Sequence, residues 1–257
     1  MKKSIVVLGG GMVGSAMALD LSTELKVKVI DIDPLALERI AQRNPEIETQ
    51  VADLSSPEVI QEIVAPFDLV LSAVPGSMGY ATLQTVLEAG KNIVDISFFP
   101  ENCLDLDQLA KDRGLTALVD IGVAPGMDNI ILGHYDTQWK ISDFECLVGG
   151  LPKVRKWPFA YKAPFSPSDV IEEYTRPARY VENSVIITRP ALTDPELVDF
   201  EQVGTLESFN TDGLRSILFT MSHIPNLKEK TLRYPGHIEY IRVLRETGFF
   251  SEDPIEV

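Results

Sequence analysis

The segment IVVLGGGMVG, residues 5–14, joins a continuous apolar run to the glycine pattern G-x-G-x-x-G. An apolar run bounded by glycines is typical of a parallel strand that is buried on both faces. Between such a strand and a following helix, this glycine pattern predicts a dinucleotide-binding turn. Gly9 permits the tight turn, Gly11 lets the backbone approach a pyrophosphate, and Gly14 lets the helix pack on the strand.

The residues that follow supply the rest of the dinucleotide pattern. The helix expected from Met12 to Glu24 begins with the amides of Met12 and Val13, which would face the phosphates. A second strand, 27–30, ends in Asp31, whose carboxylate would accept hydrogen bonds from the ribose and repel a 2′-phosphate. We therefore expect NAD rather than NADP. FAD and a glycine turn without a ligand are the alternatives.

The first half of the chain keeps alternating strands with helices. Six strands separated by helices of crossover length predict a Rossmann-type, doubly wound parallel sheet, which we assign to an NAD-binding domain over residues 1–124. Ligands of such sheets lie beyond the carboxyl ends of the strands. The side chains expected at that edge, besides the glycine loop, are Asp31, Asp53, Val74, Pro75, Asp95 and Asp120. Asp53 could bond an adenine amine or cap the next helix, and Val74-Pro75 could pass the nicotinamide ribose or form a plain turn.

The alternation stops near Ala124, and a second domain is expected over residues 125–257. Strand-like runs at 140–148, 184–188 and 197–203, with helices at 214–222 and 238–247, predict a mixed α+β substrate-binding and dimerisation domain. His134 is expected in a buried helix. The aromatic residues of the proline-rich arm 151–168 could line a pocket or form a dimer contact, and we favour the dimer contact.

Composition narrows the classes of partner. Lys and Arg number 23 against 38 Asp and Glu, a formal net charge of −15, which disfavours nucleic acid and anionic membranes. The sequence contains no run of about 18 apolar residues, so we expect no membrane span. Two cysteines in 257 residues form neither a disulfide framework nor a zinc motif, so we expect a cytoplasmic protein with no metal.

Four further motifs follow one another along the chain. They are GVAPGMDN at 122–129, GGLP at 149–152, NTDGLR at 210–215 and LRYPGH at 232–237. The series resembles the saccharopine dehydrogenase-like family, most closely its lysine 6-dehydrogenase branch, and the similarity covers essentially the whole chain. The resemblance implies a Rossmann domain, a substrate and dimerisation domain, and NAD-dependent oxidation of a carbon–nitrogen bond in an amino acid.

Several residues acquire candidate roles in that reaction. Oxidation needs a neutral amine, so a base should remove its proton, and Asp128, Asp95 and Asp120 are the acidic candidates. Asp128 is favoured, with helix capping as its alternative. His237 could act as an acid–base group or dock the following helix.

A substrate carboxylate calls for a guanidinium fork. Arg215 and Arg233 are the candidates, with a surface arginine as the alternative reading for each, and Asn210 of the same motif as Arg215 is a further substrate-binding candidate.

The resemblance favours L-lysine as substrate, oxidised to allysine with release of ammonia, in a homodimer or higher homo-oligomer. Saccharopine- or carboxynorspermidine-type dehydrogenases are the enzymatic alternatives. Family members continue well beyond the segment matching Leu232–His237, so a chain that stops at Val257 could be a truncated or shortened relative. A non-catalytic NAD-binding protein is therefore the third reading.

Overall fold

The computed structural model describes residues 3–251 and divides the chain into two compact units, Met1–Gly122 and Val123–Val257. The expected boundary at 124/125 lies two residues after the observed one. The terminal stretch 252–257, on which the expectation of a shortened chain rested, lies outside the described residues.

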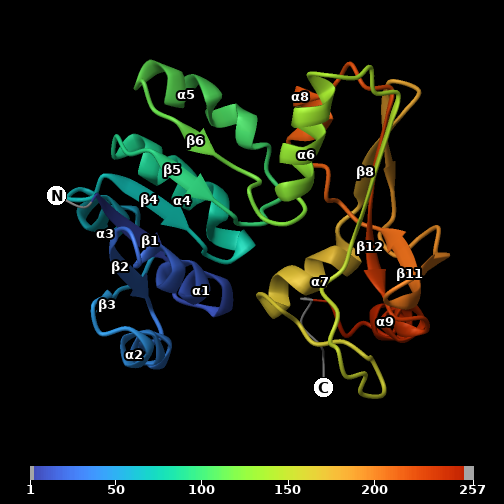
Figure 1. Ribbon diagram of the computed structural model, residues 1–257, viewed down its shortest axis with the longest axis horizontal. Coiled ribbons are helices and arrows are strands. Elements are labelled where there is room, and N and C mark those ends of the chain that lie inside the picture. Colours follow the sequence, from blue (N-terminus) through green and yellow to red (C-terminus); the bar gives the residue numbers. More distant parts are fainter. Residues whose placement is uncertain (1–2, 252–257) are drawn as a thin grey trace. The chain divides into compact units, whose positions relative to one another are not determined.

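Unit 1 contains a six-stranded parallel sheet in the order β3-β2-β1-β4-β5-β6, shown at the blue-to-green end of the chain in Figure 1. This order, with β1 and β4 adjacent at the centre, is the doubly wound arrangement expected for the first domain. The elements are β1 (Ser4–Leu8), α1 (Met12–Leu21), β2 (Lys26–Asp31), α2 (Pro34–Arg43), β3 (Glu48–Val51), α3 (Pro57–Val64), β4 (Leu69–Ser72), α4 (Gly76–Glu88), β5 (Ile93–Asp95), α5 (Asp107–Asp112) and β6 (Ala117–Leu118), with a short 3₁₀ turn at Cys103–Leu106 before α5.

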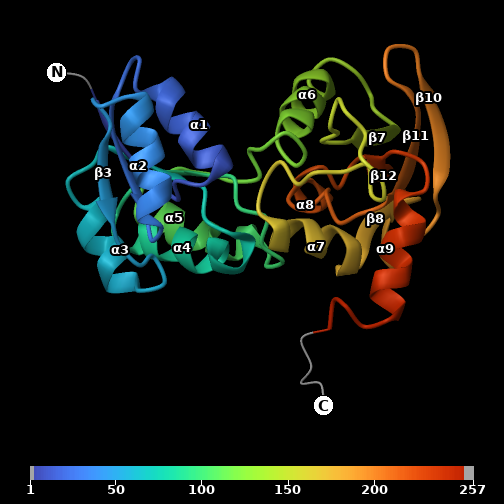
Figure 2. The same ribbon diagram turned by 90° about the horizontal axis from the view of Figure 1, so that it is seen from below.

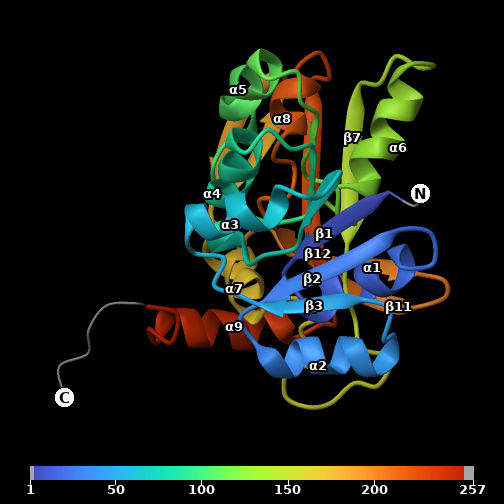
Figure 3. The same cartoon turned by 90° about the vertical axis from the view of Figure 1, so that its left-hand side faces the viewer.

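Helices cover both faces of this sheet, which is why its central strands β1 and β4 are mostly apolar. On one face Val7 of β1 and Val29 of β2 pack with Leu37 and Ile40 of α2. On the other face the alternate strand residues pack on α3, α4 and the α5 region. Figures 2 and 3 show α1 and α2 on one side of the sheet and α3 and α4 on the other. Because all six strands are parallel, their carboxyl ends meet at one edge of the sheet.

Unit 2 is a mixed α+β domain, as expected. Its sheet runs β10-β11-β12-β8-β9, with β7 parallel to β12 and the other pairs antiparallel. The elements are α6 (Met127–Asp136), β7 (Asp143–Val148), α7 (Pro167–Thr175), β8 (Ala178–Glu182), β9 (Val185–Arg189), β10 (Glu196–Phe200), β11 (Gly204–Asn210), α8 (Ile217–Thr220), β12 (Asn226–Arg233) and α9 (His237–Glu246). The helix expected over 214–222 is thus reduced to four residues.

One expectation about unit 2 changes, that of a buried His134, and the dimer contact of the aromatic arm stays a prediction. Phe159, Tyr161 and Phe165 of the proline-rich arm pack against α7 and α9 within their own unit, whereas Trp157 is 86% exposed. His134 is exposed, and the buried residues of α6 are Leu132 and Asp128, which lies in its first turn. The helix therefore packs through one narrow stripe.

The described residues contain no helix that is both long enough and apolar enough to cross a membrane. Within residues 3–251, no three His, Cys, Asp or Glu side chains are placed together as metal ligands.

Candidate functional site

The glycine loop lies at the carboxyl edge of the unit 1 sheet, between β1 and α1. Gly9 has a φ of +99°, and a Cβ there would lie 2.5 Å from the carbonyl oxygen of Ala73. A Cβ on Gly14 would collide with the carbonyl oxygen of Gly9. A Cβ on Gly11 would meet nothing within 4 Å. Gly9 and Gly14 are therefore required by the fold, whereas Gly11 leaves space on the ligand side of the loop.

The first turn of α1 offers backbone donors beside that space. Gly11 is the N-cap residue, and no side chain of the described residues caps the helix. Met12 is 57% exposed and Val13 is half-buried. Uncapped amides and the positive end of the helix dipole suit the phosphates of a dinucleotide, as the sequence predicts for Met12 and Val13.

Asp31 ties the glycine loop to the end of β2. Its Oδ2 accepts a hydrogen bond from the amide of Gly10 at 2.6 Å, and its Oδ1 accepts one from the amide of Asp33 at 2.8 Å. The carboxylate is thereby fixed at the position where an adenosine ribose would lie. The place of Asp31 after a strand predicts its contact with a ribose but not its second task of holding the loop.

Exposed apolar side chains surround this corner and were not singled out from the sequence. Ile32, Leu35 and Val51 are 65%, 63% and 56% exposed, at the ends of β2 and β3 and the start of α2. An adenine ring needs such apolar walls. Their signal in the sequence is an apolar residue next to a strand-end aspartate, as in Asp31-Ile32.

The candidates at the next two strand ends are Asp53, which follows β3, and Val74 and Pro75, which follow β4. Asp53 is exposed, and its Oδ1 accepts a hydrogen bond from the amide of Ser55 at 2.9 Å, which lowers the pKa of the carboxyl. Val74 is 5% exposed and belongs to the apolar core, and Pro75 is the N-cap residue of α4. The contact of these residues with a cofactor stays a prediction, and the observed contacts match their turn and packing alternatives.

Two of the three candidate acids lie in unit 1 and are buried. Asp95, 0% exposed, accepts hydrogen bonds from the amide of Ser97 at 3.1 Å and from its hydroxyl at 2.9 Å. Asp120 is 4% exposed and has a φ of +52°, which is uncommon for a residue with a side chain. Asp95 therefore fixes the segment after β5, and Asp120 is held in a constrained backbone position at the neighbouring strand end.

The third acid, Asp128, lies at the start of unit 2. Its Oδ1 accepts a hydrogen bond from the amide of Gly126 at 2.7 Å, so the capping role is present. Burial raises the pKa of its carboxyl, and the amides of Gly126 and Asn129 oppose that shift. Cys146 lies near it, and burial, followed by the charge of Asp128, raises the pKa of this thiol to about 12. Asp128 thus combines a helix-start position with the raised pKa that a general base uses.

His237 and Arg233 belong to one buried hydrogen-bond network. The Nδ1 of His237 lies 2.9 Å from the carbonyl oxygen of Phe159, and its Nε2 lies 2.9 Å from the hydroxyl of Tyr174. Burial lowers the pKa of His237 to about 4. Arg233, 2% exposed, donates to the hydroxyl of Tyr174, to a backbone carbonyl and to Glu173. Partners within unit 2 contact both side chains, and the acid–base role of His237 and the carboxylate contact of Arg233 stay predictions.

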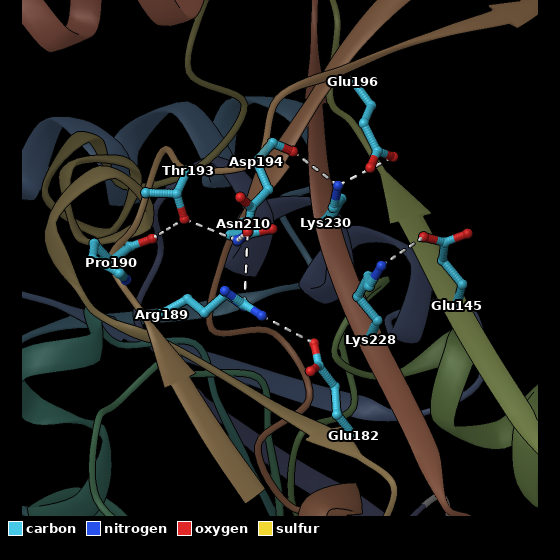
Figure 4. Close-up of polar contacts among 10 residues, drawn as sticks. All are labelled: Glu145, Glu182, Arg189, Pro190, Thr193, Asp194, Glu196, Asn210, Lys228 and Lys230. Atoms are coloured by element: carbon cyan, nitrogen blue, oxygen red, sulfur yellow. Dashed lines mark hydrogen bonds and ion pairs between the residues drawn. The ribbon is translucent and has the colours of Figure 1, made fainter.

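Asn210 likewise holds a loop of its own unit. Figure 4 shows its side chain directed at the segment before β10, where its Nδ2 donates to Asp194 at 2.8 Å and to Thr193 at 2.9 Å. The Nζ of Lys230 donates a hydrogen bond to the carbonyl oxygen of Asp194, in the same segment, at 2.9 Å. Asn210 thus has a structural task, and its contact with a substrate stays a prediction. Arg215, in contrast, is 5% exposed, has a φ of +45° and lies in a cluster of arginines.

Comparison with known proteins covers both units. Residues 5–118 match the family model described as the saccharopine dehydrogenase NADP binding domain, and residues 122–257 match that of the saccharopine dehydrogenase C-terminal domain. The chain is 25% identical over 268 residues to saccharopine dehydrogenase (NADP⁺, L-glutamate-forming) of Pyricularia oryzae, covering 98% of this chain and 59% of that protein. It is 28% identical over 231 residues to α-aminoadipic semialdehyde synthase of Arabidopsis thaliana, covering 82% of this chain and 21% of that protein.

A solved structure has the same fold. Apo saccharopine dehydrogenase (L-Glu forming) from Saccharomyces cerevisiae superposes with a TM-score of 0.73 at 20% identity, over 99% of this chain and 60% of that one. The chain thus spans less than two thirds of the length of these relatives.

Proposed function

The chain belongs to the saccharopine dehydrogenase family, and from this premise we propose that it is a nicotinamide-dinucleotide-dependent enzyme that oxidises a carbon–nitrogen bond in an amino acid. The observation that carries the proposal is the intact cofactor edge of unit 1. Gly11 leaves space for a pyrophosphate, the first turn of α1 presents its amides, and the Asp31 carboxylate lies where a ribose is expected. These residues fit a nicotinamide dinucleotide.

The same corner supports NAD as the cofactor, although the matching family model is described as NADP binding. Asp31 and Asp33 place two carboxylates where a 2′-phosphate would lie, with the apolar Ile32 between them. The nearby cation is Arg39, whose Nη2 is 3.7 Å from Asp33, and both side chains are exposed. A 2′-phosphate would therefore meet like charges.

The chemistry requires a hydride acceptor and a base. A dinucleotide held by the glycine loop and Asp31 would supply the acceptor for the hydride that leaves the carbon of the substrate's C–N bond. The chain must remove the proton of the amine, and Asp128 is our choice for that base because burial raises its pKa toward neutrality. Asp120 is the second candidate. Asp95 is the third, and its bonds to Ser97 favour a positioning role. The resulting imine is hydrolysed by water to an aldehyde and an amine.

Two substrates have support of different kinds. The names of the Pyricularia and Saccharomyces relatives favour saccharopine, which would release glutamate. The four sequence motifs favour L-lysine, which would release ammonia. A non-catalytic NAD-binding protein, the third reading, would bind the cofactor and oxidise neither amino acid.

The experiment compares the wild-type protein with Asp128→Asn, which keeps an oxygen for the amide of Gly126. We expect turnover to fall by about 100-fold or more, as for loss of a general base, while NADH affinity stays within about twofold. Fluorescence of bound NADH gives the affinity, and absorbance of reduced nicotinamide gives the rate. Undiminished turnover in Asp128→Asn would remove this residue from the chemistry. NADH binding by the wild type without oxidation of either amino acid would favour the non-catalytic protein.

A further inference from the structure

Two of the sequence motifs meet around a buried acid that neither of them contains. Glu229 lies in the central strand β12 of unit 2 and is 2% exposed. Its Oε2 accepts a hydrogen bond from the hydroxyl of Thr211 at 2.7 Å, and that hydroxyl also lies 3.0 Å from the hydroxyl of Thr231. Within residues 3–251, no arginine, lysine or histidine forms an ion pair with Glu229. A carboxyl group is thus held in the interior by hydroxyl groups, outside the chemistry proposed so far.

The motif NTDGLR, residues 210–215, encloses this carboxyl group. Thr211 supplies the hydrogen bond, and a Cβ on Gly213 would lie 2.2 Å from Oε2 of Glu229. Glycine at position 213 therefore leaves the room that the carboxyl group fills. Between these two residues, Asp212 accepts hydrogen bonds from Nε and Nη2 of Arg179 at 2.9 and 2.8 Å, which fixes the segment to β8. The motif thus determines where the carboxyl group of Glu229 lies.

Glu229 also reaches the motif GVAPGMDN, through a cysteine. Strands β12 and β7 are parallel, and Cys146 of β7 is the register partner of Glu229, so both side chains lie on the same face of the sheet. The charges of Asp128 and Glu229 both act on the Cys146 thiol, and the charge of Asp128 acts on Glu229. The proposed base and the buried acid therefore belong to one cluster, with the thiol beside both of them.

The other acids around Glu229 have arginine partners. The titratable side chains that interact with it from the surrounding elements, besides Cys146, are Asp128 of α6, Glu173 of α7, Tyr180 of β8 and Asp212 of the NTDGLR motif. Glu173 pairs with Arg233, and Asp212 pairs with Arg179. Asp128 forms no ion pair within the described part of the chain, and its Oδ1 accepts from the amide of Gly126. Asp128 is therefore the acid of this group that is least shielded from a charge on Glu229.

We propose that Glu229 is a positioning residue for Asp128, on which it acts from the neighbouring strand beside Cys146. The inference rests on the proposed function, since it concerns the base of that reaction. Burial raises the pKa of Glu229 to about 8, so its carboxyl group is uncharged at neutral pH and puts no like charge beside Asp128. When Glu229 ionises, its negative charge raises the pKa of Asp128 and makes it a stronger base. The rate of oxidation should therefore gain a step near this pH.

The test compares the wild type with Glu229→Gln, which keeps an acceptor for Thr211 but cannot ionise. Glu145→Gln is the matched control, because Glu145 adjoins Cys146 in β7 and its side chain is 51% exposed. The first measurement follows the carboxyl ¹³C signal of Asp128 against pH, in the full chain made with aspartate labelled at its side-chain carboxyl group. The signal is identified by its absence in Asp128→Asn. The second measurement is the pH profile of kcat/KM for the amino acid that is oxidised, and thermal melting checks that each variant is folded.

We expect the Asp128 signal to show a step near pH 8 in the wild type and in Glu145→Gln that Glu229→Gln lacks. The kcat/KM profile of Glu229→Gln should lose the matching rise, by about threefold. The same Asp128 titration in the wild type and Glu229→Gln would overturn the inference. An identical kcat/KM profile in these two proteins would also overturn it and would leave the proposed function intact. A step in the ¹³C signal that depends on Glu229, without oxidation of either amino acid, would support the link between the two acids and contradict the proposed function.

Discussion

The imidazole of His237 and the hydroxyl of Tyr174 lie 2.9 Å apart, and the donor and the acceptor of this hydrogen bond can be assigned from their neighbours. Nδ1 of His237 faces the carbonyl oxygen of Phe159, so this nitrogen carries the hydrogen. Nε2 of the neutral ring then accepts from the Tyr174 hydroxyl, whose oxygen accepts from Nε of Arg233 at 3.3 Å. The LRYPGH motif thus anchors the proline-rich arm and α7 to the end of β12.

His237 should make unit 2 sensitive to acid. The unfolded chain binds a proton on this ring near pH 6.5, whereas burial holds the folded pKa at about 4. Stability is therefore lost as the pH falls from about 6.5 to about 4, by up to about 3 kcal/mol. His237→Gln cannot titrate, so its free energy of unfolding should change less across this window. Urea unfolding between these pH values measures the slope, and an identical slope in the variant would contradict the assignment.

Glu229 should act in the opposite pH direction. The side chain is 2% exposed, accepts a hydrogen bond from Thr211 at 2.7 Å, and has a pKa raised by burial to about 8. The folded state keeps a proton that the unfolded state has released, so stability falls as the pH rises from about 4.5 to about 8. Glu229→Gln keeps an acceptor for Thr211 and should be the more stable protein above pH 8, by on the order of a few kcal/mol. The exposed Glu145→Gln is the control, and equal stability of wild type and Glu229→Gln at high pH would refute the prediction.

Substitutions in the glycine loop should separate folding from cofactor binding. A Cβ on Gly14 collides with the backbone of Gly9, so Gly14→Ala should lower stability by about 2 kcal/mol or more. Gly11→Ala meets no atom within 4 Å and should melt like the wild type, yet lose NADH affinity by about tenfold or more because its methyl group occupies the pyrophosphate space. Unchanged NADH affinity in Gly11→Ala would show that the dinucleotide does not approach this loop.

Asp31 should determine the choice between the two dinucleotides. Asp31→Asn keeps an oxygen for the amide of Gly10 but removes the charge, so NADH should bind about tenfold more weakly and NADPH no worse. The exposed Asp20→Asn in α1 is the control, with both affinities unchanged. Fluorescence titration of each reduced cofactor gives the ratio, and a ratio equal to that of wild type would contradict the role.

The two units differ in how far their sequences predict them. In unit 1 the central strands are buried, so the apolar run Ile5–Leu8 and the largely apolar segment 27–30 mark β1 and β2 within one residue. In unit 2 the central strand β12, NLKEKTLR, has the polar composition of a surface segment. It is buried because Glu229, Lys230 and Arg233 find partners on other elements, which no local pattern can indicate.

The candidate site follows the same division. Gly9, Gly14 and Asp31 could be assigned because their tasks are local to one strand–turn–helix unit. The contacts of His237 and Asn210 could not be predicted, because their partners Tyr174 and Asp194 lie 63 and 16 residues away. The helix α7 was recoverable, since Ser166 followed by Pro167 is a helix-start pattern.

The most direct test of the whole account is the rate of reduced-nicotinamide formation by the purified chain, with NAD or NADP as oxidant and saccharopine or L-lysine as substrate. The account predicts formation with NAD and at least one of the two amino acids, and a slower rate with NADP. Formation with neither amino acid would contradict catalysis of C–N oxidation by this chain. A faster rate with NADP than with NAD would contradict the role assigned to Asp31.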